Sequence, residues 1–307
     1  GTFAILGIGT VTQLLLIYVV NSTLPQVMEH SWGMWLLTFA PLYLISVPIG
    51  LLLLRKVPAK PLEKHDLKPS RYIVTVIICI FMMYAGNILG TIITALLQLL
   101  PGVSAGNPIL GYATDNALLP KVLFMVILAP VIEEYIFRKQ LIDRMHIYGE
   151  KLAVVTSALM FGLFHGNLSQ FFYAFALGLV FGYVYLKTGK LRYSIGLHML
   201  INLLGSVVGP FFLEKVAVVD TMENMDLAAL EPVMPWLIAF GAYVLVLIGL
   251  AIAGLVLLCL NKRKVSFAPA EMELPKGTRI KTAYVNAGMI LLTIGCMALI
   301  VASVIQL

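Results

Sequence analysis

The sequence predicts an all-α protein, a polytopic bundle of about nine helices that cross a lipid bilayer. Of its 307 residues, 60% are hydrophobic and only 12% are charged, whereas soluble domains carry about 25% charged residues. The charges are also clustered, which leaves long runs without any. Because a helix of about 20 apolar residues spans the bilayer core, these runs predict membrane-spanning segments.

Nine hydrophobic segments can be marked along the chain, separated by polar connectors. They are residues 3–20, 33–54, 72–100, 119–137, 152–166, 169–186, 193–213, 234–260 and 283–307. The connectors are too short to form a soluble domain. We therefore expect a single transmembrane domain over residues 1–307.

The basic residues lie on alternate connectors. Nineteen of the 21 Lys and Arg residues fall within 55–71, 138–151, 187–192 and 261–281, and the intervening connectors are neutral or acidic. Basic residues accumulate in cytoplasmic loops, so this alternation predicts a cytoplasmic N-terminus and an outside C-terminus. The basic residues of these connectors also account for the net charge of +6. No basic stripe is interleaved with aromatic residues, which argues against a nucleic-acid partner.

Two neighbouring carboxylates stand apart from the other acidic residues. Thirteen of the 15 Asp and Glu residues lie in or next to predicted connectors, but Glu133 and Glu134 lie inside an apolar run. An ionisable group within a bilayer costs a few kcal/mol and by default marks a functional site. Glu134 and Arg138 are four residues apart and can pair on one helical face. Glu133 points about 100° away and is a candidate general base.

Two of the five histidines also lie in, or at the end of, apolar runs. These are His165 and His198, and the latter shares a helical face with Asn202, four residues on. Glu133 and His165 are each 16 residues from Gly149. If helices flank that glycine, the two side chains lie level across an antiparallel hairpin.

Three ordered motifs resemble those of a known family. EEYIFR, residues 133–138, matches the pattern EExxxR, Phe161 to His165 matches FxxxH, and His198 to Asn202 matches HxxxN. This combination resembles the CPBP family of CAAX proteases and bacteriocin-processing enzymes, also called the Abi family and related to the CAAX prenyl endopeptidases. The resemblance covers about residues 119–210, under a third of the chain.

The resemblance implies an eight-helix core with a polar intramembrane cavity open toward the cytoplasm. Residues 119–210 would form the motif-bearing catalytic core, and residues 283–307 would be an extra C-terminal helix. The implied activity is that of an intramembrane endopeptidase of a bacterial plasma membrane. Its partners would be the bilayer and a peptide or membrane-protein substrate, prenylated and CAAX-like or otherwise membrane-associated.

The resemblance also implies a role for each motif residue. Glu133 would activate a water molecule that His165 helps to hold, and His198 and Asn202 would stabilise the oxyanion. The remaining two motif residues, Glu134 and Arg138, would support this geometry.

Three alternatives remain open from the sequence. Glu133, His165 and His198 could equally be zinc ligands with an open fourth position, although no HExxH motif is present. The chain could instead be a catalytically silent membrane scaffold of the same fold. Buried carboxylates also serve proton- or ion-coupled transporters, but no second half with its own acidic pair is present.

Overall fold

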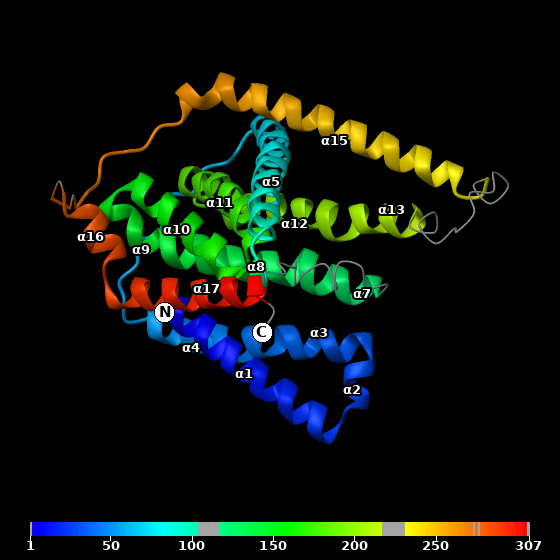
Figure 1. The fold of residues 1–307 in the computed structure, drawn as a ribbon. Coiled ribbons are helices and arrows are strands. Elements are labelled where there is room, and N and C mark those ends of the chain that lie inside the picture. Colours follow the sequence, from blue (N-terminus) through cyan, green and yellow to red (C-terminus); the bar gives the residue numbers. More distant parts are fainter. Residues whose placement is uncertain (1, 104–116, 217–230, 273, 276, 306–307) are drawn as a thin grey trace.

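Every regular element that the computed structural model describes is a helix, as the sequence predicts (Figure 1). The described residues are 2–103, 117–216, 231–272, 274–275 and 277–305. Six helical segments among them are long and apolar enough to cross a membrane. They are Trp32–Leu54, Pro69–Leu97, Leu168–Thr188, Leu191–Val216, Met234–Lys264 and Ala287–Val304.

The other three predicted segments are also helical but do not reach that length and apolarity. Residues 3–20 lie in α1 (Thr2–Thr23), whose apolar part is the shorter helix Gly7–Thr23. Residues 152–166 lie in α10 (Glu150–Phe164), which has only 15 residues. Residues 119–137 contain the acidic pair. The predicted neutral connectors 101–118 and 214–233 lie largely outside the described residues.

The N-terminal part forms a hairpin of two long helical stretches. α1 is followed by α2 (Gln26–Glu29) and by a continuous stretch of α3 (Ser31–Ala40), the π-helix η1 (Pro41–Ser46) and α4 (Val47–Leu54). α1 packs against η1 and α4. The two backbones approach closely at Gly50, where a Cβ atom would lie 2.0 Å from Ile5 Cγ1.

Helix α5 (Pro69–Leu97) lies at the centre of the molecule, between two long neighbours. α11 (Leu168–Thr188) packs against both α5 and α10, and α15 (Met234–Asn261) packs against α5. Glycines lie at each of these contacts. A Cβ at Gly86 would lie 2.3 Å from Tyr173 Cα, and one at Gly178 would lie 2.9 Å from Ala158 Cα. Small residues permit such close packing, which drives helix association in membranes.

Two helical stretches of alternating type carry the first and third motifs. The first runs through α7 (Leu118–Lys121), η2 (Val122–Leu128), α8 (Ala129–Glu134), η3 (Tyr135–Ile142), α9 (Asp143–Met145) and η4 (His146–Tyr148). The second runs through α12 (Leu191–Leu203), η5 (Leu204–Val208) and α13 (Gly209–Val216). Here η2, η3 and η5 are π-helical, a conformation that is frequent at functional sites.

The last helix is part of the same core as the motif-bearing helices. α17 (Ala287–Ile305) follows α16 (Arg279–Tyr284) and packs against α1 and α10. Figure 1 shows it, in red, between the N-terminal hairpin and the green helices α8 and α10. Leu292 and Cys296 are fully buried there, in one hydrophobic cluster with Phe137 and Phe161.

Candidate active site

The acidic pair lies at the junction between α8 and the π-helix η3. Glu134 and Arg138 are both fully buried, and Arg138 Nε donates a hydrogen bond of 3.0 Å to Glu134 Oε2. Arg138 Nη1 also donates to Ser157 Oγ on α10, at 3.0 Å. Ser157 Oγ in turn donates to the Phe137 carbonyl at 2.8 Å. The guanidinium therefore ties the helix of the acidic pair to α10.

His198 on α12 lies against both carboxylates. Its Nδ1 is 3.2 Å from Glu134 Oε1, and its Nε2 is 3.8 Å from Glu133 Oε2. A carboxylate accepts hydrogen bonds, so the Glu134 contact places a proton on Nδ1. The first and third motifs thus meet in space, with Nε2 of His198 directed toward Glu133.

His165 is held by the end of α10 and by the turn that follows it. Its Nδ1 lies 2.8 Å from the Phe161 carbonyl, which can only accept, so Nδ1 carries the proton and Nε2 keeps a lone pair. Gly166 then adopts a left-handed φ of 63°. Asn167 caps α11 by accepting from the Gln170 amide at 2.9 Å, and its Nδ2 donates to the His165 carbonyl at 2.9 Å.

The Phe161 ring is the common packing partner of the three motifs. It makes edge contacts with the rings of His165 and His198, at centroid distances of 5.0 and 5.5 Å. The Arg138 guanidinium carbon lies 4.7 Å from its centroid, within the range of a cation–π interaction. The ring of Phe181 on α11 stacks on the imidazole of His198, with the ring centroids 5.3 Å apart. Aromatic rings therefore fix the orientation of both imidazoles.

Asn202 contacts the backbone of the helix that carries the acidic pair. Its Nδ2 donates to the Met125 carbonyl at 2.8 Å. In η2 the Ala129 amide bonds five residues back, to the Phe124 carbonyl. In that register the Met125 carbonyl faces position 130, where proline has no N–H to offer. Asn202 supplies the missing donor and so stabilises the π-helical segment that precedes Glu133 and Glu134.

The placement of Glu133, His165 and His198 bears on the zinc alternative. Within the described ranges, no three His, Cys, Asp or Glu side chains are grouped so that they could hold a metal ion. The two imidazoles turn their Nδ1 atoms to other partners, His165 to the Phe161 carbonyl and His198 to Glu134. In both rings this leaves Nε2 for other ligands, as in metal-ligating histidines generally, so zinc binding by Glu133, His165 and His198 stays a prediction.

Several supporting residues were not predicted, although the sequence holds signals for them. Ser157 is four residues before Phe161 and eight before His165, so the three share one face of α10. Asn167 and Gln170 have the spacing of a capping box, and Asn167 Nδ2 donates to Gln170 Oε1. Both signals concern local helix geometry and carry no chemical signature of their own.

Comparison with known proteins agrees with the motifs. Residues 115–204 match the family model described as type II CAAX prenyl endopeptidase Rce1-like. The chain is also similar to the membrane-embedded CAAX protease MroQ of Staphylococcus aureus strain USA300, with 32% identity over 88 residues. That alignment covers 26% of this chain and 36% of the relative, so the chain spans about a third of the relative it matches. No solved structure matches the chain. Residues 115–204, which contain all three motifs, are thus similar to the type II CAAX prenyl endopeptidases of the Rce1-like family model.

Proposed function

We propose that the chain is an intramembrane endopeptidase in which Glu133 activates a water molecule for attack on a peptide bond. One observation carries the proposal: the imidazole of His198 lies between two carboxylates inside a bundle of apolar helices, 3.2 Å from Glu134 and 3.8 Å from Glu133. Hydrolysis needs a base, a water and a stabiliser for the oxyanion, and a dry site strengthens each of these contacts.

The distance between Glu133 and His198 supports a place for the water. At 3.8 Å the two atoms are too far apart for a direct hydrogen bond, and a bridging water is the usual partner across such a gap. Glu133 would take a proton from this water as its oxygen attacks the carbonyl carbon, and would pass that proton to the amide nitrogen as the C–N bond breaks. His165, whose Nε2 keeps a lone pair, would accept the water's other hydrogen and hold it in place.

The oxyanion of the tetrahedral intermediate would be bound by His198 and Asn202. In its imidazolium form His198 donates from Nε2 while Nδ1–H stays on Glu134, so the ring does not need to turn during the reaction. The Asn202 amide has two N–H donors, one of which is engaged by the Met125 carbonyl. The second would serve the oxyanion. Glu134 and Arg138 support the geometry by holding His198 and the helix junction.

The proposed setting is a polar cavity of a multi-spanning membrane protein with nine crossings. Six apolar helices among the described residues and the alternation of basic connectors support this arrangement. In it the N-terminus is cytoplasmic, the C-terminus is outside, and the cavity opens toward the basic face. The similarity to a membrane-embedded bacterial protease supports a location in a bacterial plasma membrane. The substrate class is a membrane-associated or prenylated CAAX-like peptide.

The test is a cleavage assay on the purified full-length chain in detergent or vesicles. Candidate substrates are prenylated CAAX peptides and membrane-protein peptides, and products are identified by mass spectrometry. We expect the wild type to cleave and Glu133→Gln to lose at least about 100-fold in rate, the lower range for a positioned general base. Glu63→Gln is the matched control, because Glu63 is exposed and outside the site. Binding without cleavage, or full activity in Glu133→Gln, would overturn the proposal.

A further inference from the structure

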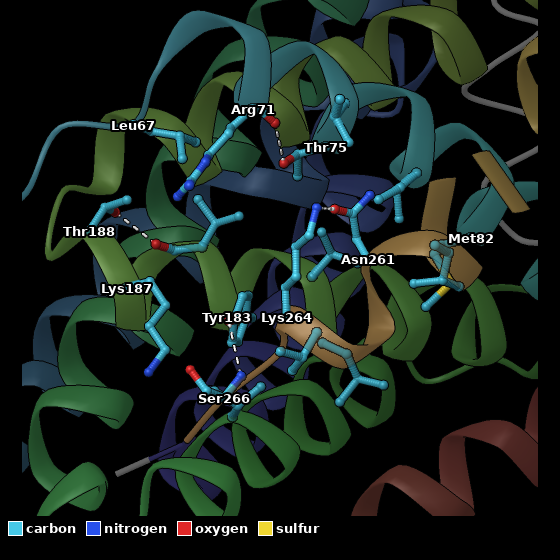
Figure 2. Close-up of a pocket in the computed structure, with 18 of the residues that line it drawn as sticks. Leu67, Arg71, Thr75, Met82, Tyr183, Lys187, Thr188, Asn261, Lys264 and Ser266 are labelled. Carbon is cyan, nitrogen blue, oxygen red and sulfur yellow. Dashed lines mark hydrogen bonds between the residues drawn. The ribbon is translucent and has the colours of Figure 1, made fainter. Parts of the chain in front are cut away.

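A large pocket lies between α5, α10, α11 and the end of α15, away from the motif residues. Its volume is about 1070 Å³, and none of the six motif residues lines it. Ligand pockets in proteins generally measure about 300–1,000 Å³, so this one is at the upper end of that range. Figure 2 shows the side chains that surround it.

The wall of the pocket is apolar and belongs to helices that can cross a membrane. Val74, Ile78 and Met82 of α5 line it together with Leu179 and Val180 of α11. Both helices are among the six candidate spans. The wall is therefore suited to hydrocarbon, and its helices place it beside acyl chains.

Four cations line the same pocket, and no Asp or Glu does. They are Arg71 in the first turn of α5, Lys151 in the first turn of α10, Lys187 near the end of α11, and Lys264, which ends η7 (Lys262–Lys264) after α15. The N-terminal turns of α5 and α10 thus lie beside the C-terminal ends of α11 and α15. The four cations therefore lie at one end of the bundle, on the face where the basic connectors lie.

Most of this positive charge is not neutralised within the protein. Lys187 Nζ pairs with Glu150 at 2.8 Å. Lys264 Nζ donates to Asn261 Oδ1 at 3.0 Å, a neutral partner that Figure 2 shows at the centre of the pocket. Within the described ranges, Arg71, Lys151 and Lys264 have no carboxylate partner. Three of the four cations are thus available to an anion.

We propose that this pocket binds an anionic diacyl phospholipid, with its acyl chains along the wall of α5 and α11. Its phosphate would sit between Arg71 and Lys264. Charge complementarity argues for this occupant, because a lipid without net charge would leave the excess positive charge of the pocket uncompensated. Basic pockets between membrane helices on one side of the bilayer are the usual sites of anionic headgroups. The bound lipid would join α15 to α5 and α11 at the basic face, independently of the proposed hydrolysis.

The test measures lipid binding by the purified full-length chain in detergent. Dioleoyl phosphatidylglycerol is added, with dioleoyl phosphatidylcholine as the neutral comparator, and retained lipid is counted by native mass spectrometry. We expect the wild type to retain phosphatidylglycerol and to unfold at a higher temperature with it. The double variant Arg71→Gln/Lys264→Gln should bind it about 10- to 30-fold more weakly, from the loss of two lipid-facing charges.

The matched control is Arg55→Gln/Lys56→Gln, which removes two exposed basic charges outside the pocket. It should bind phosphatidylglycerol as the wild type does. Val74→Trp, which narrows the apolar wall, should weaken binding without changing any charge. Equal retention of phosphatidylcholine, an equal loss in the control variant, or equal protection by inorganic phosphate alone would each overturn the proposal.

Discussion

The buried pair of Glu134 and Arg138 gives the most direct test of how the site is held together. Replacing Arg138 by Met keeps an unbranched apolar stem and removes the guanidinium with its charge. The Glu134 carboxylate, which is fully buried, then loses the guanidinium at 3.0 Å. Breaking a buried ion pair by removing one partner costs about 3–5 kcal/mol, because it leaves an uncompensated charge. Arg138→Met should lower the free energy of unfolding by that amount.

Two further variants divide this cost into its parts. Ser157→Ala removes the hydrogen bond that Ser157 Oγ accepts from the Arg138 guanidinium. It also removes the hydrogen bond that Ser157 Oγ donates to the Phe137 carbonyl. Interhelical hydrogen bonds in membrane proteins contribute about 0.6 kcal/mol on average and at most about 1.7 kcal/mol, so this loss should be smaller. Glu134→Gln/Arg138→Met leaves no unpaired charge, and the amide that replaces the Glu134 carboxylate can still contact His198. The double variant should therefore recover most of the stability that Arg138→Met loses.

The assay is equilibrium unfolding of the purified chain in mixed micelles with increasing SDS, followed by circular dichroism. The control is Arg192→Met, which removes an exposed partner of Asp66 and should cost at most about 1 kcal/mol. A loss below about 1 kcal/mol in Arg138→Met would contradict the reasoning. So would a double variant no more stable than the single one, since the cost would then not come from the unpaired charge.

Three other changes test separate features of the structure. Asn202→Leu leaves the Met125 carbonyl without its hydrogen-bond donor. The variant should lose about 0.6–1.7 kcal/mol of stability in the same unfolding assay and should cleave more slowly. A fully stable and active variant would refute the role of the hydrogen bond between Asn202 and Met125. Gly166→Ala places a Cβ at a residue with a φ of 63°, 3.2 Å from Leu299. It should lower the free energy of unfolding by at least roughly 1–2 kcal/mol. The control Gly241→Ala, which has open space around its Cβ, should not destabilise its helix. Hydrogen bonds from Lys190 and Tyr193 hold the pKa of Asp66 below its usual value. Asp66 therefore stabilises the fold fully above about pH 3.9. This contribution is lost as the pH falls through the folded-state pKa. The difference in Tm between wild type and Asp66→Asn should narrow as the pH falls from 7 to 3 in thermal unfolding, and a difference independent of pH would argue against this.

Helix positions and the meeting of two motifs could be predicted from the sequence because they depend on local patterns. Apolar runs located the helices, and a spacing of four residues predicted the contact between Glu134 and Arg138. The grouping of the acidic pair with His198 was an expectation from the family resemblance, and the structure places His198 Nδ1 3.2 Å from Glu134.

The remaining features depend on contacts that no local pattern encodes. The partner of Asn202 is decided by the π-helical register of η2, which leaves the Met125 carbonyl opposite a proline. Each imidazole turns its Nδ1 to another acceptor, a choice that composition does not reveal. The basic pocket is built from four helices far apart in the chain, so none of its cations is distinctive in its own segment.

The position of α17 has a consequence for how the protein is made. Leu299 of this helix packs against the glycine that follows His165, and Leu292 and Cys296 complete the cluster that contains Phe161. Membrane helices are inserted in the order of their synthesis, so the motif-bearing helices reach the bilayer more than 80 residues before α17 does. Until that helix arrives, the turn beside His165 lacks one of its packing surfaces. The motif-bearing helices alone would thus lack the support that α17 gives to the residues around His165.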